Sequence, residues 1–306
     1  MPEFDGVDVR LTNRDKLYWP AGSDGSLSVT KGEMLEYYES IAPIMLPHVA
    51  ERAASLLRCP EGVGDECFFA KQAPEGRPEW VKTIGIWAKT SNREVDYIVV
   101  NDIATLMWAA NLGAIEFHVS PARASSLGLP TYVVFDLDPG PPADAADCAE
   151  VALMIRDRLA DFGLRGFAKS SGSKGVHVIV PLNSPTTFEK TETFAHRIAA
   201  QIQETSPDRV VTKMRKELRA GKVLIDWSQN QRHKTTVAPY SVRAKARPTV
   251  SAPLHWGEIE AASESGSADG LFFEIDRMAE RVDELGDLMG EATELIQLLP
   301  EELTRT

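Results

Sequence analysis

One stretch of the chain, residues 131–140, alternates between apolar and polar positions in the way that a half-buried strand requires. Its β-prone residues predict a strand, and the Pro-Gly pair at its end predicts a turn. Side chains alternate between the two faces of a strand, so Asp136 and Asp138 are expected to share one face. Phe135 and Leu137 are expected to point the other way, into a core.

Periodicity elsewhere along the chain predicts further helices and strands. Thr30 followed by Glu33 has the pattern of a capping box, which predicts a helix that begins there and that Pro43 kinks or ends. Apolar residues at helical spacing predict a helix over 145–161, with Gly163 as its C-cap. The other expected elements are helices over 103–112 and 188–204, a mostly helical tail from 256, and strands within 7–19 and over 97–100, 114–119, 166–169, 176–180 and 222–227.

The composition is that of a globular protein whose charge is unevenly distributed. Of the 306 residues, 43% are hydrophobic and 25% are charged, and no apolar run approaches the length of a membrane span. The formal net charge is −12, but residues 254–306 carry 14 acidic side chains against 3 basic ones. The preceding part is close to neutral and contains two basic clusters, 213–222 and 232–247. A single cluster would suggest only a solvated face, whereas two beside a candidate metal strand favour a phosphate-rich ligand.

The chain has three cysteines, Cys59, Cys67 and Cys148, and no Cys-x-x-Cys pair. This odd number and spacing predict reduced thiols in a cytoplasm and no structural zinc. The N-terminus has no apolar segment of the kind that a signal peptide contains. We therefore expect a cytoplasmic protein without a membrane partner.

Three polar features are candidates for phosphate chemistry. Asp136 and Asp138 form the first, because two carboxylates on one face repel each other unless a cation such as Mg²⁺ or Mn²⁺ lies between them. The second is the run Ser-Ser-Gly-Ser-Lys-Gly-Val-His at 170–177, where a Gly-rich turn would leave backbone N–H groups for an anion. The third is Asp226, which closes an apolar strand and needs a partner if it is buried. Taken singly, a solvated turn or a local hydrogen bond explains each of them as well.

Together, these features predict a two-metal site for phosphoryl transfer. Three carboxylates would hold two divalent ions, one activating a hydroxyl and the other neutralising the leaving pyrophosphate. The side chains that could clamp a triphosphate are Ser171, Lys174, His177, Lys234 and Arg243. The run at 170–177 lacks the Walker spacing, which excludes a P-loop.

Several runs of sequence resemble the polymerase module of bacterial and archaeal DNA ligase D, a branch of the archaeo-eukaryotic primase superfamily. The most specific are Val-Val-Phe-Asp-Leu-Asp-Pro-Gly (133–140), Ser-Gly-Ser-Lys-Gly-Val-His (171–177), Asp-Trp-Ser-Gln-Asn (226–230) and Lys-Thr-Thr-Val-Ala-Pro-Tyr-Ser-Val-Arg (234–243). The runs at 11–16 and 68–72 also resemble that family, and the similarity covers nearly the whole chain. One departure is Leu57-Arg58-Cys59-Pro60, where relatives often carry two basic residues and a Trp before the proline.

The resemblance implies a fold, a domain plan and a function. The fold would be an α+β primase-polymerase fold, with mixed and antiparallel sheets flanked by helices and an RRM-like catalytic core. One domain would cover 1–306, made of an N-terminal lobe (1–130), a catalytic core (131–253) and an acidic helical tail (254–306) that packs on the core. The function would be a nucleotidyltransferase that adds ribonucleotides or deoxynucleotides to DNA 3′ ends and fills gaps during double-strand break repair by end joining. The partners would be DNA ends or gapped DNA with a 5′-phosphate, NTP or dNTP, Ku and a DNA ligase.

The resemblance also implies a role for each matching residue. The metal ligands for two Mg²⁺ or Mn²⁺ ions would be Asp136, Asp138 and Asp226. The residues that bind the incoming nucleotide would be Arg58, Phe68, His118, Ser171, Lys174, His177, Gln229, Lys234 and Arg243, with His118 near the sugar and Phe68 on the base. The residues that bind DNA would be Asn13, Lys16 and Lys31, which hold a 5′-phosphate, and Arg219 in a mobile basic loop. The zinc motif of cellular primases is missing, so the cysteines do not support de novo priming.

Two other classes of protein remain open. An Asp-nucleophile phosphatase also has Asp-x-Asp after an apolar strand, but a Gly-Thr or similar pair normally follows the second Asp, where this chain has Pro139. Release of phosphate from phosphomonoesters without nucleotide addition would favour that class. The other class is a non-catalytic DNA-end scaffold that recruits Ku and a ligase, which an Asp136 variant that still supports repair would favour.

Overall fold

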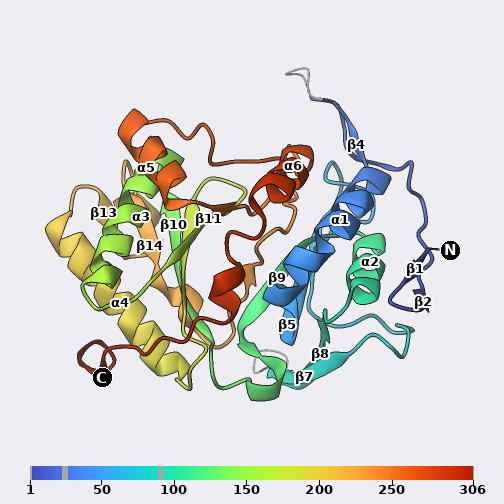
Figure 1. The fold of residues 1–306 in the computed structure, drawn as a ribbon, viewed down its shortest axis with the longest axis horizontal. Helices are drawn as coiled ribbons and strands as arrows, with labels where there is room; N and C mark the ends of the chain where they lie inside the picture. The colour runs from blue at the N-terminus through green and yellow to red at the C-terminus, as the bar shows by residue number, and fades with distance from the viewer. Residues whose placement is uncertain (1, 23–26, 89–91, 306) are drawn as a thin grey trace. The chain divides into compact units, whose positions relative to one another are not determined.

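The computed structural model describes residues 2–22, 27–88 and 92–305, and the chain divides into two compact units, each built from segments distant in the sequence (Figure 1). Unit 1 comprises Met1–Ser120, Thr235–Val250 and Glu274–Gly286, and unit 2 comprises Pro121–Lys234, Ser251–Phe273 and Asp287–Thr306. The acidic tail therefore contributes to both units. The domain plan expected from the sequence, one domain with three consecutive parts, stays a prediction.

Unit 2 is built on a six-stranded sheet with the strand order β13-β14-β10-β12-β11-β16. Its central strand, β10 (Tyr132–Pro139), runs antiparallel to both neighbours, β12 (Val176–Pro181) and β14 (Val223–Asp226). The outer strands are β11 (Phe167–Ser170), β13 (Val210–Val211) and β16 (Pro253–Leu254). The helices of this unit are α3 (Ala145–Ala160), α4 (Phe188–Thr205) and α5 (Trp256–Ser265).

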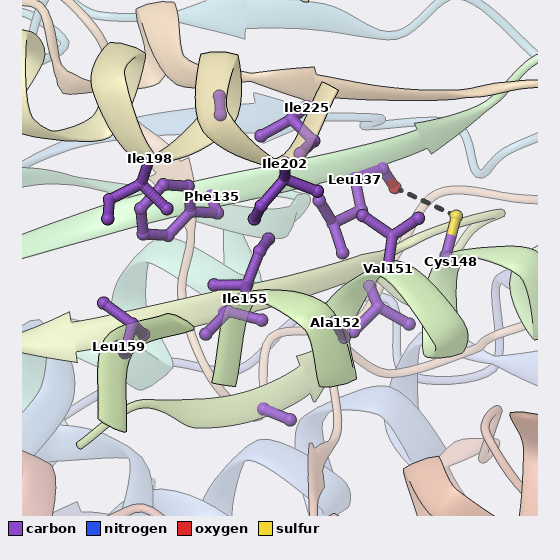
Figure 2. Packing of buried hydrophobic residues seen from close by; sticks show 14 of the residues in the cluster. Phe135, Leu137, Cys148, Val151, Ala152, Ile155, Leu159, Ile198, Ile202 and Ile225 are labelled. Atoms are coloured by element: carbon purple, nitrogen blue, oxygen red, sulfur yellow. Dashed lines mark hydrogen bonds between the residues drawn. The ribbon is translucent and has the colours of Figure 1, made fainter. Parts of the chain in front are cut away.

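One face of this sheet forms an apolar core with α3 and α4 (Figure 2). Phe135 and Leu137 are fully buried there, as the alternation along β10 predicts. Burying a side chain of this size stabilises the fold by roughly 1.5–3 kcal/mol. Cys148 of α3 lies in the same core, where its thiol donates to the Leu137 carbonyl at 3.5 Å. The core therefore fixes the strand that carries the candidate carboxylates.

The opposite face of β10 is covered along its first half and carries carboxylates along its second. Val134 belongs to a small apolar cluster with Met289, against which Tyr132 packs. Asp136 and Asp138 follow on the same face, since Phe135 and Leu137 point into the other core. The prediction that the two carboxylates share one face is confirmed.

Unit 1 contains a second sheet, in which β15-β9-β5-β8-β7 are neighbours and β6 pairs with β5. The strands of that sheet are β5 (Arg52–Arg58), β6 (Phe68–Ala70), β7 (Thr83–Ala88), β8 (Arg93–Val99), β9 (Ala114–Arg123) and β15 (Thr236–Val237). Two two-stranded sheets pair β1 (Glu3–Phe4) with β2 (Val7–Asp8) and β3 (Leu17–Trp19) with β4 (Val29–Thr30). The helices of this unit are α1 (Lys31–Val49), α2 (Ile103–Asn111) and α6 (Ile275–Leu285), which packs on α1.

Helix α1 confirms one sequence prediction and corrects another. The Glu33 N–H donates to Thr30 Oγ1 at 3.2 Å and the Thr30 N–H donates to Glu33 Oε2 at 2.7 Å, which completes the capping box. The helix continues past Pro43 to Val49, so the expectation that this proline ends it is wrong, and a kink at Pro43 stays a prediction. The reason is tertiary packing: Tyr38 and Met45, on either side of the proline, are both fully buried.

Helix α3 ends close to where the sequence predicts. It spans the predicted residues to within one position, but its C-cap is Asp161. Gly163 follows in the turn, with φ of +68°, a conformation that a residue without Cβ adopts at no steric cost. The Gly163 N–H donates to the Ala160 carbonyl at 2.9 Å and the Leu164 N–H donates to the Leu159 carbonyl at 3.0 Å, the Schellman pattern that closes a helix, so the prediction that Gly163 closes this helix is confirmed.

Cys59 and Cys67 form a disulfide, and Cys148 is a buried free thiol. The expectation of reduced thiols is wrong for the bonded pair. Strand register explains the pairing. Arg58, the last residue of β5, lies opposite Phe68, the first residue of β6, so Cys59 after Arg58 and Cys67 before Phe68 also face each other. Separately, no helix in the described part of the chain is long and apolar enough to cross a membrane.

Candidate active site

Two carboxylates and an imidazole lie in a row across three neighbouring strands of unit 2. Asp136 on β10 lies directly opposite His177 on β12 and directly opposite Asp226 on β14, so the three side chains share one face. His177 Nε2 is 3.1 Å from Asp136 Oδ1. Asp138 adds a third carboxylate two residues further along β10. Antiparallel pairing on both sides of β10 thus gathers residues that are far apart in the sequence.

Gln229 bridges two of these carboxylates. It lies in the turn η3 (Trp227–Asn230), which directly follows β14. Its Nε2 donates to Asp136 Oδ2 at 3.3 Å and to Asp226 Oδ2 at 3.2 Å, so these oxygens converge on one point. Asn230 anchors the turn, because its side chain accepts from the Val134 N–H and donates to the Val134 carbonyl, both at 2.8 Å.

The pKa of Asp138 reports the crowding of negative charge at this site. Partial burial, and then the charges of Asp136 and Asp226, raise the pKa of Asp138 to about 6, while Arg219 and Lys174 act in the opposite direction. Such an excess of negative charge favours a bound cation. Within 2–22, 27–88 and 92–305, however, no group of three or more His, Cys, Asp or Glu side chains has the geometry of a ready metal centre.

The Gly-rich turn between β11 and β12 lies against β10. A Cβ added at Gly175 would be 1.9 Å from the Leu137 carbonyl oxygen, so only glycine fits there. Ser171 Oγ accepts from the N–H groups of Ser173 at 3.2 Å and Gly175 at 3.1 Å, and the Ser171 N–H donates to the Gly175 carbonyl at 2.9 Å. These three N–H groups therefore stabilise the turn and are not left for an anion, whereas anion binding by the rest of the turn stays a prediction. Lys174, at the tip, is exposed.

Arg219 belongs to the basic cluster 213–222, and its backbone lies against Gly140, directly after β10. A Cβ added at Gly140 would be 2.0 Å from the Arg219 carbonyl oxygen, and the Gly140 N–H donates to the Lys222 carbonyl at 2.8 Å. The Arg219 side chain donates to the Met214 carbonyl at 2.6 Å. Its predicted contact with DNA stays a prediction, as does the contact of the half-buried Lys234 with a triphosphate.

In unit 1, the buried residue Glu116 holds two of the residues predicted to bind the nucleotide. Glu116 Oε2 is 2.7 Å from His118 Nε2 and 3.1 Å from Arg243 Nε, and its Oε1 accepts from the Ala244 N–H at 2.9 Å. Burial alone would raise the pKa of Glu116, but the hydrogen bond to His118 and the charge of Arg243 lower it to about 2. We did not single out Glu116 in the sequence, although the spacing Glu-x-His within a strand places both side chains on one face.

Arg58 and Phe68 face each other across the β5–β6 hairpin. The Arg58 guanidinium carbon is 5.4 Å from the centre of the Phe68 ring, and Arg58 Nε and Nη2 donate to the Leu112 carbonyl at 3.0 and 2.8 Å. Phe68 is 44% exposed and Phe69 is 58% exposed, and the Phe69 ring meets the His118 ring edge to face. Exposed aromatic rings beside a fixed guanidinium form a surface on which a base can stack.

The three residues predicted to hold a 5′-phosphate lie together at the start of α1. The Lys31 N–H donates to the Lys16 carbonyl at 2.8 Å, and the Lys16 N–H donates to the Asn13 carbonyl at 3.1 Å. The Lys31 side chain is buried, and its Nζ donates to the Thr12 carbonyl at 2.8 Å and to Asn111 Oδ1 at 2.9 Å. Burial and the nearby charge of Lys16 lower the pKa of Lys31 to about 8.

Lys16 already has an anionic partner. Its Nζ is 2.9 Å from both carboxylate oxygens of Glu61 and donates to the Pro60 carbonyl at 3.1 Å. A phosphate at Lys16 would therefore compete with Glu61. Of the residues between Lys16 and Lys31, positions 23–26 lie outside the described residues.

Comparison with known proteins gives the family of this chain. The model of the LigD primase-polymerase domain matches residues 30–289. The chain is 39% identical over 283 residues to a multifunctional non-homologous end joining protein LigD of Mycolicibacterium smegmatis, which covers 92% of this chain and 35% of that protein. It is 31% identical over 279 residues to a bifunctional non-homologous end joining protein LigD of Bacillus subtilis, which covers 91% of this chain and 43% of that protein. The chain thus spans less than half of the length of these relatives.

A solved structure is similar over nearly the whole chain. It is the polymerase domain of Mycobacterium tuberculosis ligase D in complex with DNA, which is 35% identical, with a TM-score of 0.85 over 95% of this chain and 99% of that one. The fold and the matching family model together define the primase-polymerase class of nucleotidyltransferases. The chain belongs to the LigD primase-polymerase domain family.

Family membership tests the expected family, fold and enzyme class, and it bears on the phosphatase alternative. The predicted family, the α+β primase-polymerase fold and the enzyme class are confirmed. Membership argues against the phosphatase alternative, because that class has a different fold and reaction. The roles of the individual site residues stay predictions.

Proposed function

We propose that this chain adds nucleotides to DNA 3′ ends and fills gaps during end joining, with a preference for ribonucleotides. The observation that carries the proposal is the convergence of Asp136 and Asp226 on the Gln229 amide, beside Asp138, in a chain of this family. The relatives are non-homologous end joining proteins and the similar solved structure contains DNA, which supports a DNA substrate. Ku and a DNA ligase are the proposed protein partners, and the cytoplasm is the proposed location.

The proposed metal ligands are Asp136, Asp138 and Asp226. Their carboxylate oxygens are the donors that Mg²⁺ and Mn²⁺ prefer, and the raised pKa of Asp138 reflects negative charge that the protein does not fully offset. Two divalent ions bound there would neutralise charge on the phosphates and acidify the attacking 3′-hydroxyl. Gln229 would have to turn its amide away from the two carboxylates to admit a cation, which frees that amide for the nucleotide.

In each unit, the remaining residues predicted to bind the nucleotide would bind and orient the part of the substrate that they contact. We assign Lys174 and Lys234 to the triphosphate because a positioned cation lowers the free energy of a phosphate that is losing its leaving group. Asp136 is held by His177, which fixes the direction of its carboxylate. In unit 1, the exposed ring of Phe68 would stack on the base and His118 would lie near the sugar.

Primer extension on a gapped duplex with a 5′-phosphate tests this function. We expect nucleotide addition in the presence of Mn²⁺ or Mg²⁺, with kcat/KM for ribonucleotides about tenfold or more above that for deoxynucleotides, because a site built to bond a hydroxyl disfavours the analogue that lacks it. Failure to add either nucleotide with either ion would refute the proposed function. Equal kcat/KM values would refute only the preference for ribose.

The preference for a 5′-phosphate is expected to depend on pH. Lys31 has a pKa lowered to about 8, so it is mostly charged at pH 7 and loses its charge as the pH rises through about 8. A terminal phosphate has a second pKa of about 6, so it is mostly doubly charged at pH 7 and above. Tighter binding of 5′-phosphorylated than of 5′-hydroxyl gapped DNA should therefore be present at pH 7 and decline above pH 8, and bound phosphate will move the midpoint upward.

Fluorescence anisotropy on the two DNA substrates across pH and salt measures this preference. Lys31→Met keeps the aliphatic stem and removes the charge, so its preference should be smaller and independent of pH over this range. The wild-type difference should also shrink as salt rises, because the contact is ionic. A wild-type preference that grows above pH 8 would contradict the assignment of Lys31.

Removing the competing carboxylate of Glu61 is expected to strengthen phosphate binding. The Lys16–Glu61 ion pair has side chains that are 28% and 64% exposed, so it is worth no more than about 1 kcal/mol. Glu61→Gln should therefore tighten binding of 5′-phosphorylated DNA by up to about fivefold and leave 5′-hydroxyl DNA nearly unchanged. The matched control is Glu36→Gln, which breaks the exposed Arg14–Glu36 pair close by and should have no such effect. Equal responses of the two variants would show a general charge effect and remove Lys16 from the phosphate site.

A further inference from the structure

Glu116 is a buried carboxylate with three partners on two segments of unit 1. It lies on β9, two residues before His118, and only 2% of it is exposed. Arg243 and the Ala244 N–H reach it from the segment 235–250, which pairs with β9 through Val237 opposite His118. A second tie holds that segment in place, since the Phe117 N–H donates to Ser241 Oγ at 2.9 Å. The carboxylate therefore sits in a fixed frame.

The contact with His118 determines which ring nitrogen carries the proton. An ionised carboxylate only accepts hydrogen bonds, so in the 2.7 Å contact between Glu116 Oε2 and His118 Nε2 the hydrogen belongs to the imidazole. A neutral imidazole has one N–H, and when Nε2 carries it, Nδ1 presents a lone pair. The ring is also held on one side by Phe69, whose ring centre is 5.2 Å away.

We propose that Glu116 is the positioning residue for ribose selectivity: it holds His118 in the Nε2–H tautomer, so that Nδ1 accepts a hydrogen bond from the 2′-hydroxyl of the incoming ribonucleotide. The inference rests on the proposed function, which puts His118 near the sugar. A deoxynucleotide offers no hydrogen at this position and leaves Nδ1 without that bond. The same carboxylate restrains Arg243, so one side chain orders a residue for the sugar and a residue for the triphosphate.

The tautomer can be observed without measuring activity. ¹⁵N NMR of the histidine side chains distinguishes a protonated ring nitrogen from an unprotonated one, and His118 is assigned by the loss of its signals in His118→Asn. We expect the wild-type protein, in the neutral state of the ring, to show a protonated Nε2 and an unprotonated Nδ1. The opposite tautomer, or a mixture of the two, would overturn the proposal even if the chain adds nucleotides.

Glu116→Gln tests the consequence for selectivity. The amide can donate to Nε2 as well as accept from it, so it no longer imposes one tautomer, and it removes the ionic contact between Glu116 and Arg243. The ratio of kcat/KM for ribonucleotides to that for deoxynucleotides should fall about tenfold, mainly through a higher KM for ribonucleotides. The loosened Arg243 should raise KM for both nucleotides, and the ratio removes that common effect.

Glu274→Gln is the matched control. It breaks the Arg247–Glu274 ion pair, which holds the same segment 235–250 through a different carboxylate. This variant should keep the wild-type ratio, whatever its stability. If Glu116→Gln proves unfolded by circular dichroism, Glu116→Asp, which keeps the acceptor, should preserve the tautomer and most of the ratio. A wild-type ratio in a folded Glu116→Gln protein would overturn the proposal, whereas a wild-type chain that adds no nucleotide would refute the proposed function instead.

Discussion

Replacing Asp136, Asp138 or Asp226 by alanine is expected to reduce nucleotide addition by on the order of a thousandfold or more. Each change removes a carboxylate from the face where negative charge is concentrated, and with it a ligand for the ions that would neutralise the phosphates. The rate of single-nucleotide extension with saturating Mn²⁺ measures the loss. Near wild-type extension by any of the three variants would refute that residue as a ligand.

The three variants should differ in stability, which separates loss of chemistry from loss of fold. Asp138→Ala removes one of three mutually repelling carboxylates, so the protein should unfold at the same or a higher temperature. Asp226→Ala should lower the free energy of unfolding by about 1 kcal/mol, because Asp226 Oδ1 caps the following turn by accepting from the Ser228 N–H at 3.0 Å. DNA binding should persist in both. If an inactive Asp136→Ala chain still supported end joining, the scaffold alternative would gain weight.

Gly175→Ala is expected to destabilise the protein by about 3 kcal/mol or more. The added Cβ would be 1.9 Å from the Leu137 carbonyl oxygen, and the atom that it meets is backbone, which cannot move aside as a side-chain end could. Relief requires the Gly-rich turn to move away from β10, which also displaces Lys174. Chemical denaturation measures the stability, and nucleotide addition should fall even where the variant is folded.

The control for this prediction is Gly257→Ala in the same unit. Gly257 lies inside α5 and has nothing within 4 Å of an added Cβ. Alanine is the better helix former, so this variant should be neutral or more stable by up to about 1 kcal/mol. A Gly175→Ala protein as stable as Gly257→Ala would show that the close approach of the turn to β10 does not constrain the fold.

The sequence predicts those parts of the site that depend only on which residues are neighbours along the chain. The alternation along β10 is a property of consecutive residues, so it places Asp136 and Asp138 on one face without any knowledge of the sheet. The position of Asp226 beside Asp136 depends on which strands pair and in which register, and neither follows from spacing along the chain. The sequence singles out Asp226 because it closes an apolar strand, but spacing along the chain does not place its carboxylate beside Asp136.

The expectations that the structure corrects were wrong for the same physical reason, namely contacts that form only when the chain folds. Pro43 is a helix breaker by its own chemistry, but the burial of neighbouring side chains overrides that tendency. The Gly-rich turn has N–H groups that could bind an anion, but the Ser171 hydroxyl accepts from two of them. Glu116 contacts His118, two residues away on the same strand, but its contact with Arg243 joins segments distant in the sequence and does not follow from local spacing. In each case a contact between remote or folded-back segments decides the outcome.

The disulfide between Cys59 and Cys67 affects how any sample of this protein should be prepared. It closes residues 59–67 into a covalent ring that carries Glu61, the partner of Lys16, and that adjoins Arg58 and Phe68 at its two ends. A preparation kept in dithiothreitol and one purified in air are therefore two chemical species. They differ next to the pair Arg58 and Phe68 and next to Lys16. Affinities from the two preparations are comparable only when the thiol content of each sample has been counted.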